Sequence, residues 1–147
     1  MVGVDIDIRK HNRRAIEKHP MVKRITMIRG SSIAPEVIAK VKKIAKGKKK
    51  VMIFLDSNHS HDHVLRECEL YSQLVSIGSY LVVWDTVTEF MPKEAIGSQP
   101  RPWGRGNNPW TAAKVFLKKN KNFVVDKRIE NKLLITVAPG GFLKRIK

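Results

Sequence analysis

Short apolar runs, separated by polar segments with helical periodicity, organise the chain. Four of these runs are rich in β-branched and aromatic residues and lack the in-and-out alternation of a half-exposed strand. They cover residues 2–6, 25–29, 51–56 and 80–85. Uniformly apolar strands are typical of a parallel sheet covered on both faces, so the pattern predicts a mostly parallel sheet flanked by helices.

Between the runs, apolar positions recur with the spacing of amphipathic helices. Residues 35–45 and 61–75 each predict one helix. Asn108 and Pro109 form a cap-and-first-turn signal for a third helix, which should end near Asn120. Strands that alternate with helices predict an α/β fold, and 147 residues are the size of a single domain.

Two further apolar runs, residues 122–126 and 132–137, are joined by a short charged turn. Short connections join neighbouring antiparallel strands, so these runs predict an antiparallel pair at one edge of the sheet. The segment 92–108 is rich in Gly, Pro and Asn, which indicates a loop. Its pattern leaves open whether this loop is a substrate lid or a disordered connection.

The net charge of +16, from 29 basic and 13 acidic residues, favours an acidic partner such as nucleic acid or an anionic membrane surface. The densest basic stretch, residues 40–50, overlaps a predicted amphipathic helix, so most of its lysines should face solvent. No aromatic residue interleaves with these lysines as a base-stacking platform. Nucleic-acid binding therefore stays an alternative.

No apolar run approaches the roughly 20 residues of a membrane span, and the N-terminus lacks the apolar core of a signal peptide. We therefore expect a cytoplasmic protein. The lone cysteine, Cys68, excludes an internal disulfide and a cysteine metal cluster. Its position on an apolar helix face predicts a buried core residue.

Carboxylates close three of the predicted strands: Asp5, Asp56 and Asp85. In an open α/β sheet, ligands bind beyond the carboxyl ends of the strands, so these positions favour a functional site. Such a carboxylate can accept hydrogen bonds from ribose hydroxyls, and several together can hold a hard cation such as Mg²⁺.

Three histidines follow Asp56 at alternate positions. His59 falls in the loop between a predicted strand and a predicted helix, where it can face a ligand as a general base or as a neighbour of a cation. His61 and His63 fall in the first helical turn on different faces, which favours structural roles. A three-histidine zinc site is not expected from this spacing.

Several blocks match one family: GVDIDIR, RITMIRGSS, LDSNHSHDHVLRECELYSQLVSIGSYLVVWDT and LLITVAPGGFLKRI. They resemble the cephalosporin hydroxylase and rhamnosyl O-methyltransferase family of class I S-adenosylmethionine-dependent methyltransferases. The resemblance covers nearly the whole chain. It implies a Rossmann-like sheet and methyl transfer from S-adenosylmethionine to a hydroxyl, often on a sugar or glycolipid, with help from Mg²⁺.

The resemblance also implies roles for individual residues. Asp5 matches the residue that holds the cofactor ribose, and Ser31, after Gly30, falls where a loop approaches the adenine. Asp56 matches a magnesium ligand. His59 matches the proposed base, which removes the proton of the acceptor hydroxyl while the metal lowers the pKa of that proton.

Two departures from the family pattern bear on activity. Where the family has Glu-Asp, both of them metal ligands, this chain has Trp84 and Asp85, so we expect a two-carboxylate site of lower Mg²⁺ affinity. The family's glycine-rich first strand would lie upstream of Val2, so we expect a methyltransferase-like domain that is incomplete at its N-terminus and binds the cofactor weakly. The chain can then be a fragment, an inactive remnant or a repurposed binding protein, and the sequence does not decide among them. It also leaves open the identity of the acceptor and whether the protein forms a homo-oligomer.

Overall fold

The computed structural model of the chain describes residues 1–92, 95 and 101–147. These residues form two compact units, Met1–Lys46 and Gly47–Lys147. Each unit has its own sheet and its own buried side chains. The interpretation of the chain as one domain stays a prediction. Residues 93–94 and 96–100 of the predicted loop lie outside the described residues, so the question of a lid stays open as well.

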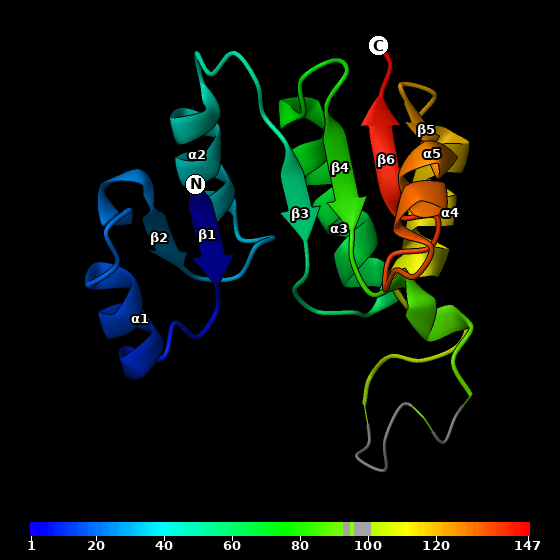
Figure 1. The fold of residues 1–147 in the computed structure, drawn as a ribbon, viewed down its shortest axis with the longest axis horizontal. Coiled ribbons are helices and arrows are strands. Elements are labelled where there is room, and N and C mark those ends of the chain that lie inside the picture. The colour runs from blue at the N-terminus through cyan, green and yellow to red at the C-terminus, as the bar shows by residue number, and fades with distance from the viewer. Residues whose placement is uncertain (93–94, 96–100) are drawn as a thin grey trace. The chain divides into compact units, whose positions relative to one another are not determined.

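The first unit is built on two parallel strands (Figure 1). In chain order it contains β1 (Val2–Asp5), α1 (Lys10–Glu17), a short 3-10 helix (Val22–Arg24), β2 (Thr26–Arg29) and α2 (Pro35–Ala45). The pairing of β1 with β2 runs from Val2 opposite Thr26 to Asp5 opposite Arg29. Both strands therefore end at the same edge, which places Asp5 beside the turn that follows β2.

Helix α2 follows the sequence prediction closely. Pro35 occupies its first turn, where a missing N–H costs nothing, and Val37, Ile38 and Val41 form its buried stripe. Lys40 and the other lysines up to residue 50 are exposed, as the helical spacing predicted.

The second unit holds a four-stranded mixed sheet in the order β3-β4-β6-β5. Its elements in chain order are β3 (Ile53–Leu55), α3 (His61–Tyr71), a 3-10 turn (Ser72–Leu74), β4 (Tyr80–Val83), a 3-10 helix η3 (Thr86–Glu89), α4 (Pro109–Lys119), β5 (Phe123–Val125), α5 (Lys127–Leu133) and β6 (Phe142–Arg145). Strands β3 and β4 are parallel, and β6 is antiparallel to both β4 and β5.

Helices α3 and α4 lie on one face of this sheet, and the short α5 lies beside β6 and β5 on the other (Figure 1). On the face of α3 and α4, Leu81 and Val83 of β4 are fully buried. On the opposite face Val82 packs with Ala138 and Phe142, and Ile129 of α5 lies against this cluster. Consecutive residues of β4 are therefore buried on opposite faces of the sheet, which explains why its sequence is apolar throughout.

The predicted α/β class is confirmed, but the described strands make two parallel and two antiparallel pairings, so the sheets are mixed rather than mostly parallel. The prediction of a strand at residues 132–137 is wrong. That segment contains the end of α5 and an irregular connection, and the strand that pairs with β5 is β6. Asp126 explains the difference, because its carboxylate caps the N-terminus of α5 by accepting from the Arg128 N–H.

Cys68 is fully buried, as its position on the apolar stripe predicted. Burial raises the pKa of the Cys68 thiol, and the charges of Glu67 and Glu69 raise it further. Of the described helices, none combines the length and apolarity that crossing a bilayer requires.

Gly141, at the start of β6, lies where the chain passes closest to the end of β4. A Cβ at this position would overlap the carbonyl oxygen of Val83 and approach Ala138 to 3.2 Å. We expect Gly141→Ala to lower the free energy of unfolding by about 1–3 kcal/mol, because the rigid β4 backbone cannot move aside. Urea denaturation measures this, with Gly104→Ala as the control, since a Cβ at Gly104 would meet nothing within 4 Å. Equal stability of the two variants would contradict this packing.

The buried carboxylate of Asp126 makes the corner between β5 and α5 sensitive to acid. Its oxygens accept from Nε and Nη2 of Arg128, each at 2.9 Å, and from the Tyr80 hydroxyl at 2.9 Å. Hydrogen bonds from Arg128 hold the pKa of Asp126 well below its usual range, and the Tyr80 hydroxyl lowers it further, against an opposing effect of burial.

A carboxyl with a depressed pKa in the folded state stabilises the fold above its unfolded pKa of about 3.9, and this stabilisation is lost as the pH falls below that value. We therefore expect Asp126→Asn to be less stable than the parent chain at pH 7 and the difference to shrink below about pH 4. Thermal unfolding across this range measures the effect, with Asp62→Asn, at an exposed position, as the control. A difference that does not change with pH would refute the assignment.

Candidate functional site

Three potential metal ligands meet at one edge of the second unit: Asp56, His59 and Asp85. Because β3 and β4 are parallel neighbours, the segments that follow them leave the sheet at the same edge. Asp56 directly follows β3, and His59 lies in the loop to α3. One ligand atom from each of the three residues lies within 4.8 Å of the other two. The sequence prediction of carboxylates converging at this edge holds for Asp56 and Asp85.

His59 lies between the two carboxylates. Its Nε2 is 3.4 Å from Oδ1 of Asp56 and 3.4 Å from Oδ2 of Asp85. The side chains of His59, Asp85 and Asp56 are 18%, 37% and 63% exposed, so the cluster opens to solvent from the side of Asp56. Asp85 has a left-handed backbone conformation with φ of 53°, which aspartate tolerates better than most residues.

The chemistry of this donor set fits a hard divalent cation. Carboxylate oxygens suit Mg²⁺ and Mn²⁺, and Mg²⁺ is commonly held by one or two carboxylates together with waters and substrate oxygens. Asp56 and Asp85 supply those two carboxylates. The imidazole of His59 is close enough to serve as a third ligand or to exchange a proton with a group bound beside the cation.

Glu67 is a buried residue of this region that the sequence analysis did not single out. Its side chain is 2% exposed, and its Oε1 accepts a hydrogen bond of 2.8 Å from the Ser57 hydroxyl. Nε2 of His63 lies 3.7 Å from the same oxygen, while Oε2 has no hydrogen-bond partner among the described residues. Glu67 therefore ties α3 to the residue that follows Asp56. Its place on the apolar stripe, three residues after Val64, was the signal available in the sequence.

Asn108 joins the start of α4 to Glu89 and to the segment that carries Trp103. It is fully buried and caps α4 as predicted, because its Oδ1 accepts from the N–H groups of Trp110 and Thr111. Its Nδ2 donates to Oε2 of Glu89, and the Gly106 N–H donates to the same oxygen at 2.8 Å. The bond from Gly106 and the bond from Asn108 lower the pKa of Glu89 against an opposing effect of burial.

His61 links α3 to α4 rather than facing the carboxylates. Its Nδ1 lies 2.7 Å from the Thr111 hydroxyl, and its backbone N–H donates to Oδ1 of Asn107 at 2.8 Å. These contacts agree with the structural role that the sequence favoured for His61.

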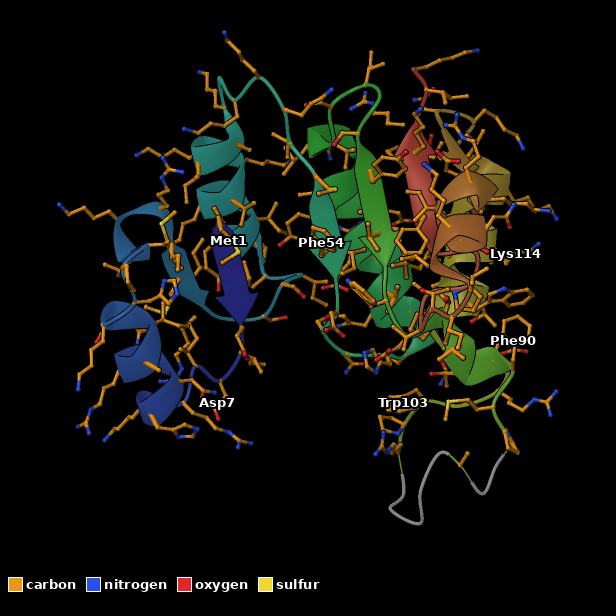
Figure 2. The ribbon with its side chains drawn as sticks, viewed as in Figure 1. Met1, Asp7, Phe54, Phe90, Trp103 and Lys114 are labelled. Carbon is orange, nitrogen blue, oxygen red and sulfur yellow. The ribbon has the colours of Figure 1, made fainter. Side chains whose placement is uncertain are left out.

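Trp103 lies against His59, and sequence reasoning missed it. The centroids of the two rings are 5.2 Å apart, in an edge-to-face arrangement with an interplanar angle of 71°. Figure 2 shows Trp103 beyond the sheet edge toward which β3 and β4 point. The Trp-Gly sequence inside a Gly- and Pro-rich loop was the only hint, and it does not specify a partner for the ring.

Trp84, at the position where the family resemblance predicted a carboxylate, packs on the sheet. Its ring stacks on Phe54 with centroids 6.4 Å apart, and it lies against the cluster formed by Val82, Ala138 and Phe142. Position 84 thus belongs to the sheet face covered by α5.

The predicted cofactor residues lie in the first unit, at the carboxyl ends of β1 and β2. The Gly30 N–H donates to the Asp5 carbonyl at 2.9 Å, and Oδ1 of Asp5 accepts from the Asp7 N–H. Gly30 has a φ of 148°, and a Cβ there would come within 2.7 Å of Val37. Ser31 begins the turn into α2, with its carbonyl accepting from Ala34. The structure therefore brings Asp5 and Gly30 together, and their cofactor roles stay predictions.

The sequence of the chain also matches a known protein family. Residues 1–146 match the family model described as Rhamnosyl O-methyltransferase/CmcI. The chain belongs to this family.

Curated relatives named rhamnosyl O-methyltransferase occur in Mycobacterium tuberculosis (strain H37Rv) and Mycobacterium bovis (strain BCG / Pasteur 1173P2). Each is 32% identical over 123 residues, a match that covers 82% of this chain and 47% of the relative. The chain thus spans about half the length of the curated relatives it matches, and the family resemblance of the sequence is confirmed.

The bond between Ser57 and Glu67 should hold the loop that carries Asp56 and His59. We expect Ser57→Ala to destabilise the chain by about 1–3 kcal/mol, because it leaves a buried carboxylate without its hydroxyl donor. The same variant should speed amide hydrogen exchange in the loop at Asn58 and His59, measured by NMR.

Ser60→Ala is the matched control, because the Ser60 side chain makes no capping bond to α3. The double variant Ser57→Ala/Glu67→Leu should recover part of the lost stability, since it removes both partners of the bond. Additive effects of the two substitutions would contradict the proposed coupling.

Proposed function

We propose that this chain carries part of the active site of an S-adenosylmethionine-dependent sugar O-methyltransferase that uses a divalent cation. The convergence of Asp56, His59 and Asp85 at one sheet edge carries the proposal. Membership of the rhamnosyl O-methyltransferase/CmcI family supports the reaction class and a hydroxyl acceptor on a sugar or glycolipid. The whole reaction is proposed for a polypeptide of the length of the relatives, because this chain spans 47% of them.

In this proposal the two aspartates and the histidine have separate tasks. Asp56 and Asp85 would hold the cation through their carboxylates. Nε2 of His59 accepts the proton of the acceptor hydroxyl. When bound, the cation supplies a Lewis acid that lowers the pKa of this hydroxyl, and S-adenosylmethionine supplies the methyl group. Burial of His59 against Trp103 keeps the imidazole in position between the carboxylates.

Asp5, Gly30 and Ser31 would hold the nucleoside part of the cofactor. The exposed Asp5 carboxylate suits the ribose hydroxyls, and the close approach of Gly30 to Val37 leaves room for backbone alone at the turn. A cytoplasmic location also belongs to this proposal.

Binding of Mn²⁺, measured by electron paramagnetic resonance, tests the cation site directly. We expect Asp56→Asn and Asp85→Asn each to weaken Mn²⁺ affinity by at least about tenfold, because each removes an anionic oxygen ligand. Asp62→Asn is the matched control, since it removes the same charge from an exposed position in the first turn of α3. Affinity unchanged in both site variants, or reduced equally by the control, would overturn the cation site and with it the proposed function.

A further inference from the structure

The ring of Trp103 is placed where an acceptor must approach. It contacts His59 edge to face, and His59 in turn contacts both carboxylates of the cluster. A substrate hydroxyl that reaches Nε2 of His59 therefore brings the rest of its molecule next to this indole. Trp103 is partly exposed, so its surface is available to a ligand.

Arg101 covers one face of the Trp103 ring. Its guanidinium carbon lies over the Trp103 ring at 4.6 Å from the centroid, which marks one ring face as open enough to accept a planar group. Arg101 is exposed, and a cation–π contact at an exposed site is weak and readily exchanged. A ligand that stacks on this face can displace the guanidinium, whose five N–H donors then reach the edge of the ligand.

The segment around Trp103 is held in place by a dense set of bonds. Nδ2 of Asn107 donates to the Pro102 carbonyl at 2.7 Å, and Nδ2 of the buried Asn108 donates to the Gly104 carbonyl at 2.8 Å. Both residues that flank Trp103 are thus anchored to the start of α4. A ring fixed on both sides in this way presents a preorganised surface, which is the arrangement that a recognition site requires.

We propose that Trp103 and Arg101 form the acceptor subsite, in which the indole stacks on the apolar face of a sugar ring and Arg101 donates to the hydroxyls at its edge. The inference rests on the proposed function, since it takes the hydroxyl at His59 as the reacting group. A sugar ring suits the subsite, because it combines an apolar face of C–H groups with hydroxyls at its edge. Ligand sites commonly pair aromatic walls with a few polar groups in the same way.

The probe for this subsite is methyl α-L-rhamnopyranoside. It is titrated into the 147-residue chain in buffer without Mn²⁺, and binding is followed by saturation-transfer NMR. We expect Trp103→Ala to weaken its binding by on the order of tenfold, Trp103→Phe to retain part of it, and Arg101→Ala to weaken it less than Trp103→Ala does. Trp110→Ala is the matched control, because Trp110 also carries a cation over its ring, Lys114 at 5.3 Å, but contacts Phe90 instead of His59. Figure 2 shows Lys114 and Trp103 at separate places on the unit.

Two further measurements separate this inference from the proposed function. The NMR chemical shifts of the His59 ring protons should change in Trp103→Ala and not in Trp110→Ala, which verifies the ring contact in solution. In Trp103→Ala, Mn²⁺ binding should still depend on Asp56 and Asp85, because both carboxylates stay in place. If Mn²⁺ binds through Asp56 and Asp85 but the rhamnoside binds Trp103→Ala as well as the parent chain, or binds neither, the acceptor subsite is wrong while the cation site stands. If Mn²⁺ affinity does not depend on the two carboxylates, the proposed function itself is wrong.

Discussion

The parallel pairing of β3 with β4 is the interaction on which the candidate site depends. It sets Leu55 opposite Val83, and the Trp84 N–H extends the ladder by donating to the Leu55 carbonyl at 3.0 Å. Both strands therefore end at the same level, and the two aspartates that follow them are brought within reach of one ion. A slip of one residue in this register would move every side chain of β4 to the opposite face and would separate the carboxylates.

The sheet sets where the carboxylates are, but the helices set what surrounds them. The loop that carries His59 is tied to α3 through the buried Glu67, and the segment that carries Trp103 is tied to α4 through the buried Asn108. Both anchors are polar groups inside the fold, where an unmade hydrogen bond is costly, so each favours one loop conformation over its alternatives. The site is thus rigid on two sides and open to solvent near Asp56.

Features that depend on one strand or helix were predictable from the sequence, and features that depend on distant contacts were not. Uniformly apolar runs that end in aspartate identified β3, β4 and the residues Asp56 and Asp85. The run at residues 132–137 has the same apolar character, but helix α5, which begins after the Asp126 cap, continues into it as far as Leu133. Trp103 meets His59 only because two separate loops converge, and no local pattern encodes that contact. Its role could be read only from the folded chain.

Trp84 lies where the family resemblance predicted a third carboxylate, and its packing is compatible with the proposed chemistry. The ring of Trp84 lies on the sheet face that holds Val82, where it stacks on Phe54, while Asp85 has a left-handed backbone conformation and lies in the metal-ligand cluster. Nε2 of His59 lies 3.4 Å from each carboxylate, and its single lone pair cannot bind the cation and accept a proton at the same time. In the proposed mechanism two carboxylates hold the cation, which suits an ion that keeps several waters, and His59 stays available for the proton of the acceptor. A tryptophan in place of the third carboxylate that the resemblance predicted would then lower cation affinity without removing the proposed base.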